Sequence, residues 1–139
     1  MNTCLSETAA AEAGKFYHGN VMGAETNLHI IHDLFPKIDA WNINSWDNCW
    51  YAAFVYWCCI KSGINLPVRC PDPAVSCNFA GVIAWEQWAK LLEVNRWKGK
   101  GDKAAMGDIV LFDRVFEDKE HDHIGVVCKW IHKHGRDGV

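Results

Sequence analysis

A strongly apolar stretch lies in the middle of the chain, at residues 47–62, and its apolar side chains cover nearly the whole circumference of a helix. A helix that is apolar all round is typical of one buried in a protein core. Asp47 and Asn48 are both good N-caps, so the pattern predicts that this central helix begins at one of them. It is expected to end at Ser62, because Gly63 can adopt the left-handed conformation that closes a helix.

Weaker helical patterns precede and follow this central helix. Apolar positions at helical spacing predict a helix over residues 26–35, which Pro36 stops, and another over about residues 80–92. Residues 1–24 are small and polar and include three glycines. We therefore expect a loosely ordered lead-in, with a short helix at about residues 6–13.

Toward the C-terminus the pattern changes from helical to β. Residues 109–112 form a short apolar run, residues 113–122 a charged, hairpin-like loop, and residues 124–130 the next strand. We expect residues 133–138 to form a final turn. Because helices come first and strands later, the sequence predicts a single α+β domain that covers the whole chain.

Composition narrows the class of protein. The chain has 139 residues, half of them hydrophobic, and eight tryptophans, which favours one folded domain over disorder. A formal net charge of −3 without a basic stripe argues against nucleic-acid binding, and the chain has no run of 18 apolar residues that would span a membrane. An odd number of cysteines, seven, and no secretory signal favour synthesis in a reducing cytoplasm. A protein that is released by lysis or by a dedicated injector would show the same features.

Two residues at the starts of predicted elements point to cysteine chemistry. Cys49 lies at the start of the central helix, where the helix dipole lowers the pKa of a thiol, and His123 opens the second predicted strand. A nearby imidazole can take the proton of such a thiol, so the pair predicts a cysteine nucleophile with a histidine base. The histidines lack the spacing of a zinc site, and no phosphate or dinucleotide motif is present, so we expect no metal and no cofactor.

Three sequence blocks together resemble the NlpC-type and CHAP cysteine hydrolases. They are W-Y-A-A-F-V-Y-W-C at residues 50–58, G-D-I-V-L-F at residues 107–112 and D-H-I-G-V-V at residues 122–127. The resemblance implies a papain-like fold, in which N-terminal helices and a buried central helix pack on a small antiparallel sheet. It also implies an enzyme that cleaves an amide or peptide bond in bacterial peptidoglycan through a cysteine–histidine dyad, with the stem peptide or the glycan as its ligand.

The resemblance leaves the nucleophile open between two positions. In an alignment without gaps, the position of the family's cysteine holds Tyr51, and the spacing to Gly63 agrees with that register. Cys49 lies two residues earlier, about 200° away around an ideal helix, and a phenol with a pKa of about 10 does not replace a thiol. Either the helix begins differently and Cys49 takes the nucleophile position, or the chain is a catalytically inactive domain that binds wall peptide or a partner protein.

Residues near the proposed cleft complete the predicted site. We expect the backbone N–H of the nucleophile, together with Asn48 or Asn44, to hold the oxyanion. Trp41, Trp46 and Asp122 are candidates for contact with the substrate. The family takes a third polar residue from the strand after the histidine strand, and this chain reaches its last residue about where that strand would begin. We therefore expect either a dyad or an incomplete triad whose final strand is missing.

Overall fold

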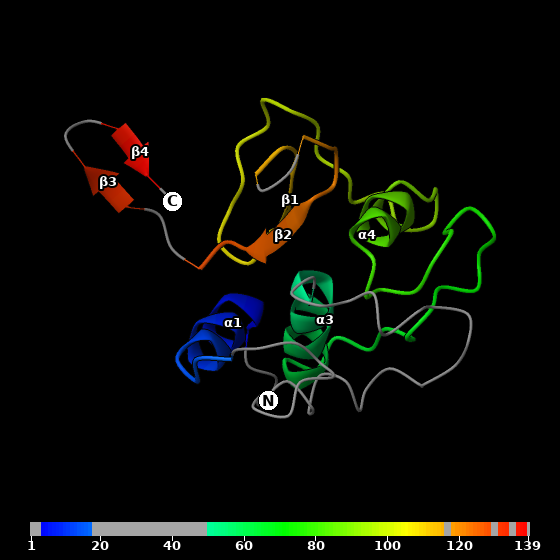
Figure 1. Cartoon of the computed structure of the whole chain (residues 1–139), viewed down its shortest axis with the longest axis horizontal. Helices are drawn as coiled ribbons and strands as arrows, with labels where there is room; N and C mark the ends of the chain where they lie inside the picture. The colour runs from blue at the N-terminus through cyan, green and yellow to red at the C-terminus, as the bar shows by residue number, and fades with distance from the viewer. Residues whose placement is uncertain (1–3, 18–49, 116–117, 129–130, 134–135, 139) are drawn as a thin grey trace.

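The computed structural model describes residues 4–17, 50–115, 118–128, 131–133 and 136–138, and these residues form a small α+β structure (Figure 1). The α+β class predicted from the order of elements is confirmed. The helices and strands are α1 (Leu5–Ala13), α3 (Tyr51–Lys61), α4 (Val82–Ala89), β1 (Ile109–Phe112), β2 (His123–Val126), β3 (Ile131–Lys133) and β4 (Arg136–Gly138). The helix predicted over residues 26–35 lies outside the described residues. Within the described part of the chain, no helix is both long and apolar enough to cross a bilayer.

The central helix α3 ends where the sequence predicts. Gly63 has a φ of 88°, in the left-handed region. Its N–H donates to the carbonyl of Ile60 at 3.0 Å, and the N–H of Ile64 donates to the carbonyl of Cys59 at 2.9 Å. These two hydrogen bonds form a Schellman motif, which satisfies the last carbonyls of the helix and stops it after Lys61.

The N-terminal end of α3 differs from the prediction. The helix begins at Tyr51, and Trp50 is its N-cap, whose carbonyl accepts the N–H of Phe54 at 2.9 Å. The predicted start at Asp47 or Asn48 is therefore wrong. A capping side chain contributes only about 1 kcal/mol. The ring of Trp50 lies 6.0 Å from that of Tyr51 and 6.2 Å from that of Phe54, so aromatic packing supports the first turn.

The N-terminal segment contains α1, which packs against α3 and belongs to the core. Leu5 and Ala9 are buried in the same hydrophobic cluster as the inner face of α3. The short helix predicted near residues 6–13 is thus confirmed, whereas a loosely ordered lead-in does not describe residues 5–13. The buried side chains of α1 are mostly small or polar, so its hydrophobic pattern is weak in the sequence.

A buried carboxylate joins α1 to α3. Glu12 is only 2% exposed, and its carboxylate accepts hydrogen bonds from Lys15 Nζ at 2.9 Å, Tyr17 Oη at 2.7 Å and Trp57 Nε1 at 3.2 Å. Lys61 Nζ lies 3.4 Å from the same carboxylate. Burial alone would raise the pKa of Glu12, but these donors outweigh it and lower the pKa to about 2. The carboxylate is therefore charged, and four side chains compensate the charge.

β1 and β2 form an antiparallel hairpin in which Phe112 pairs with His123. The first strand matches the prediction, but β2 is shorter than the strand predicted over residues 124–130. The N–H of Gly107 donates to the carbonyl of Val127 at 2.8 Å. The N–H of Val127 donates to the carbonyl of Asp108 at 2.9 Å, so the hydrogen bonding continues past β1 to Gly107, whose φ of 88° lies in the left-handed region. The pairing places His123 at the end of the hairpin nearest the charged loop.

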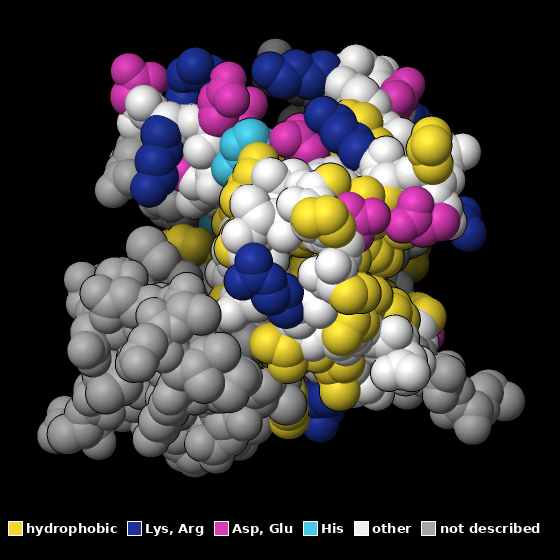
Figure 2. Space-filling view, turned by 90° about the vertical axis from the view of Figure 1, so that its right-hand side faces the viewer, with side chains coloured by type: hydrophobic (Ala, Val, Ile, Leu, Met, Phe, Trp, Pro, Cys, Tyr) yellow, Lys and Arg dark blue, Asp and Glu magenta, His cyan; other side chains and the backbone are white. Residues whose placement is uncertain are grey.

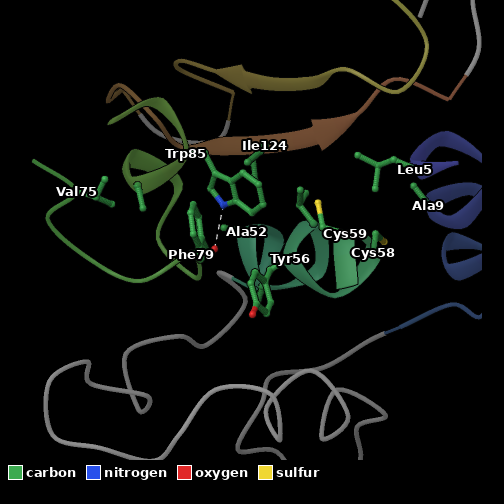
Figure 3. Close-up of a cluster of buried hydrophobic side chains, with 13 residues drawn as sticks. Leu5, Ala9, Ala52, Tyr56, Cys58, Cys59, Val75, Phe79, Trp85 and Ile124 are labelled. Atoms are coloured by element: carbon green, nitrogen blue, oxygen red, sulfur yellow. Dashed lines mark hydrogen bonds between the residues drawn. The ribbon is translucent and has the colours of Figure 1, made fainter. Parts of the chain in front are cut away.

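The core lies between α3, the hairpin and α4 (Figure 3). The ring of Phe79 stacks on Tyr56, with centroids 6.2 Å apart, and lies 4.8 Å from Trp85 of α4. Trp85 Nε1 donates to the carbonyl of Phe79 at 3.0 Å, so the buried indole N–H is satisfied. Ile124 closes the cluster from β2. α4 lies inside the helix predicted over residues 80–92 and is shorter, because the chain turns on both sides of it.

A second hairpin replaces the final turn predicted for residues 133–138. β3 and β4 pair antiparallel, with Ile131 opposite Gly138 and Lys133 opposite Arg136. Each strand has three residues and no alternation of apolar and polar positions, so the sequence pattern could not reveal them. Figure 1 shows this hairpin beyond the end of β2, apart from the three helices.

Candidate functional site

The start of α3 meets the start of β2, and this junction is the candidate site. Tyr51, the first residue of α3, lies against His123, the first residue of β2. Their ring centroids are 4.5 Å apart with an interplanar angle of 84°, an edge-to-face contact. On the neighbouring strand, the ring of Phe112 stacks on the same imidazole, with centroids 5.7 Å apart and an angle of 28°. Two aromatic rings therefore fix the orientation of His123.

The environment of His123 favours its neutral form. Burial lowers the pKa of the imidazole below its ordinary value, and the charge of the adjacent Asp122 carboxylate opposes this shift without cancelling it. The imidazole is thus uncharged at neutral pH. A neutral imidazole can accept a proton or take part in a hydrogen bond with an amide.

Asp122 supports the loop that carries His123. Its side chain is buried, and Asp122 Oδ1 accepts the backbone N–H of Val115 at 3.0 Å. Its own N–H donates to the carbonyl of Phe112 at 3.2 Å. The carboxylate thus ties the two ends of the loop together beside the imidazole, while its predicted contact with a substrate stays a prediction.

The rim of the site is apolar and partly exposed. Phe112 and Val115 are both exposed large hydrophobic residues, and they lie on the strand and loop next to His123. Trp50, half-buried, flanks Tyr51 on the helix side. A ligand in this place would meet aromatic surface around one polar, uncharged ring.

Several predicted site residues lie outside the described residues. They are the proposed nucleophile, the two oxyanion candidates and the two tryptophans expected to contact substrate: Cys49, Asn48, Asn44, Trp41 and Trp46. Of the predicted site residues, the structure describes three, Tyr51, Asp122 and His123, and brings them together. Among the described residues, the side chain that faces His123 from the start of α3 is thus a phenol.

Sequence reasoning missed the part that Phe112 has in this site. The signal was present, because Phe112 is the last residue of the first predicted strand and a hairpin loop leads from it to His123. Pairing the two strands across that loop would have placed the two residues opposite each other.

The described residues contain no cluster of three or more histidine, cysteine or acidic side chains that could hold a metal ion. The six described cysteines are all free thiols: Cys4, Cys58, Cys59, Cys70, Cys77 and Cys128. Burial raises the pKa of both Cys58 and Cys59 to about 12, so neither is a reactive thiolate at neutral pH.

Comparison with known proteins gives no relative. No family model, no curated protein and no solved structure matches the chain.

Proposed function

We propose that the chain is a papain-like domain of the NlpC/CHAP type that binds the stem peptide of bacterial peptidoglycan and does not cleave it. The observation that carries this proposal is the contact between Tyr51 and His123, at the place where such enzymes hold their cysteine against their histidine. The ligand lies in the cell wall, so the protein would act there after lysis or injection.

The arrangement of elements supports the papain-like part of the proposal. The two C-terminal sequence blocks that carry the resemblance form one antiparallel hairpin, and the histidine of the second block faces the first residue of the buried helix. This is the relation that a nucleophile at a helix start and a base at a strand start require.

The chemistry of Tyr51 supports binding over cleavage. A phenol has an ordinary pKa of about 10, so it is protonated and poorly nucleophilic beside a neutral imidazole. A peptide could instead place an amide against His123 and an apolar side chain against the exposed Phe112 and Val115. The surface that would orient a substrate for cleavage would then bind the peptide without cleaving it.

The second candidate function is cleavage with Cys49 as nucleophile, and the neutral state of His123 favours it. In that reaction His123 takes the thiol proton as Cys49 Sγ attacks the carbonyl carbon. The C–N bond breaks, and the amine leaves with the proton from the imidazolium. Water, deprotonated by His123, then hydrolyses the thioester and restores the thiol.

One set of variants distinguishes the two functions. Purified peptidoglycan is offered to the wild type, Cys49→Ala, Tyr51→Cys and His123→Ala, and both co-sedimentation and release of soluble fragments are measured. The proposal expects the wild type and Cys49→Ala to bind equally and release nothing, and Tyr51→Cys to release fragments. The double variant that combines Tyr51→Cys with His123→Ala should release no fragments, because the new thiol then lacks its base.

Two outcomes would overturn the binding proposal. Release by the wild type that disappears in Cys49→Ala would assign the chain to the hydrolases. A wild type that neither binds peptidoglycan nor releases fragments from it would exclude peptidoglycan as the ligand. Alkylation of Tyr51→Cys by iodoacetamide at neutral pH checks independently that position 51 lies at the positive end of α3.

A further inference from the structure

A hollow lies beside α4 and β1, apart from the contact between Tyr51 and His123. It is a groove of about 1070 Å³ between α4, residues 96–104 and β1, and neither Tyr51 nor His123 lines it. Its volume lies slightly above the range of ~300–1,000 Å³ typical of small-molecule sites. Figure 2 views the molecule from the α4 side and shows side chains of both charges mixed with hydrophobic ones on this face.

An exposed indole forms part of the groove wall. Trp97 is 40% exposed, although a tryptophan normally buries most of its surface. Lys90, the C-cap of α4, lies over it, with Nζ 4.9 Å from the ring centroid. Trp88, half-buried on α4, lines the same groove. Flat apolar rings with polar neighbours suit a ligand that has both an apolar face and hydrogen-bonding groups.

Each lysine along the groove lies beside a carboxylate. Lys98 Nζ lies 2.9 Å from Asp108 Oδ2, and Lys100 Nζ lies 3.6 Å from the carboxylate of Asp113. Because each ammonium group lies beside a carboxylate, the field in the groove is nearly balanced. A neutral ligand rich in hydroxyls can bond to such pairs, whereas an ionic ligand would repel one member of each pair.

His121 is a strained residue held in this groove. Its φ of 56° is unusual for a residue with a side chain. Its N–H donates to Asp113 Oδ1 at 3.0 Å, and its Nε2 lies 2.8 Å from Glu86 Oε2 of α4. These two bonds hold the strained backbone in place. Residues held in a strained conformation are frequent at binding sites. The pair from His121 and Glu86 offers one more donor and acceptor to a ligand.

We propose that this groove binds a neutral oligosaccharide, with one sugar ring stacked on Trp97 and its hydroxyls bonded to the paired charges. If the proposed function holds, that oligosaccharide is the glycan strand of peptidoglycan, while the stem peptide lies at Tyr51 and His123. The residues that line the groove are not part of the proposed stem-peptide site at Tyr51 and His123.

The test is titration of the full chain with the β-1,4-linked tetramer of N-acetylglucosamine, followed by calorimetry. Replacing a stacked tryptophan removes most of its contact area, so Trp97→Ala should weaken binding about tenfold or more. Trp97→Phe should retain part of the affinity, and Glu86→Gln should weaken it. Leu92→Ala is the matched control, because Leu92 is an exposed hydrophobic residue that does not line the groove.

Three results would overturn the inference. They are no binding of the tetramer by the wild type, equal affinity in Trp97→Ala, and tighter binding of an anionic tetramer such as tetragalacturonate. Tyr51→Ala and His123→Ala should leave the affinity for the sugar tetramer unchanged. Loss of stem-peptide binding with sugar binding intact would therefore count against the proposed function alone.

Discussion

At the scale of single residues, Glu12 is the clearest case of a charge that holds the fold together. The folded pKa of about 2 lies below the ordinary 4.5, so the carboxylate stabilises the fold fully above about pH 4.5 and loses that contribution as the pH falls toward 2. Glu12→Gln should lower the free energy of unfolding at pH 7 by about 2 kcal/mol, because it leaves charged donors without their acceptor. Urea unfolding at pH 7 and at pH 3 measures the change.

The matched control for Glu12 is Glu7→Gln on the same helix. Glu7 is exposed, so its replacement should change the free energy of unfolding by less than about 0.5 kcal/mol. The difference between wild type and Glu12→Gln should shrink at pH 3. An equal effect of both substitutions, or a difference that grows in acid, would contradict the role assigned to Glu12.

His123 leads to a second prediction at this scale. Its pKa is lowered by burial and partly restored by Asp122, so the histidine should titrate below its ordinary value of 6.5. Asp122→Asn should lower the pKa further, because it removes the negative charge that favours the imidazolium. NMR titration of the imidazole carbon-bound protons measures both values. A pKa of His123 above 6.5, or one that rises in Asp122→Asn, would be incompatible with this environment.

At the scale of elements, the end of α3 depends on one glycine. Gly63 has a φ of 88°, and a side chain there costs about 1–2 kcal/mol relative to glycine. Gly63→Ala should therefore reduce the free energy of unfolding by about that amount in chemical denaturation. Gly99→Ala is the control, since a Cβ at Gly99 meets nothing closer than 3.9 Å. Equal stability of the two variants would show that the Schellman motif does not fix the end of the helix.

The same helix shows what sequence can and cannot predict about elements. Its C-terminal end follows from local chemistry, because only glycine adopts the required φ without strain. Its N-terminal end does not, because Asp47 and Asn48 offer good local caps but Trp50 packs on Tyr51 and Phe54 instead. The sequence predicts an element end when the signal is a backbone constraint, and fails when tertiary packing competes with a weak preference.

The candidate site, too, was predicted from the sequence only in part. His123 was predicted because it opens a strand, and Tyr51 because the spacing of the family motif places it at the nucleophile position. The contact between their rings depends on how the hairpin packs on α3, which no sequence period specifies. The position of Phe112 opposite His123 follows from the hairpin register, and pairing the two strands across their loop would have predicted it.

At the scale of the whole molecule, one continuous core joins the first helix to the hairpin. The cluster runs from Leu5 in α1 through α3 to Trp85 in α4 and Ile124 in β2. Removing any of these elements would expose the apolar surface of the others. We therefore expect the described helices and the β1–β2 hairpin to unfold together, as small domains usually do.

The two adjacent, buried thiols of α3 can be used to measure that cooperative unfolding. Cys58 is 0% exposed and Cys59 is 1% exposed, and burial raises the pKa of both to about 12. A thiol reagent at pH 8 should therefore modify them only when the structure opens, while the exposed Cys4 reacts at once. If unfolding is global, the two labelling rates should be equal, and the loss of about 2 kcal/mol in Glu12→Gln should raise both about thirtyfold. Mass spectrometry of the labelled peptides follows each site separately. Faster labelling of Cys58 alone would mean that α1 detaches from α3 before the rest of the core opens.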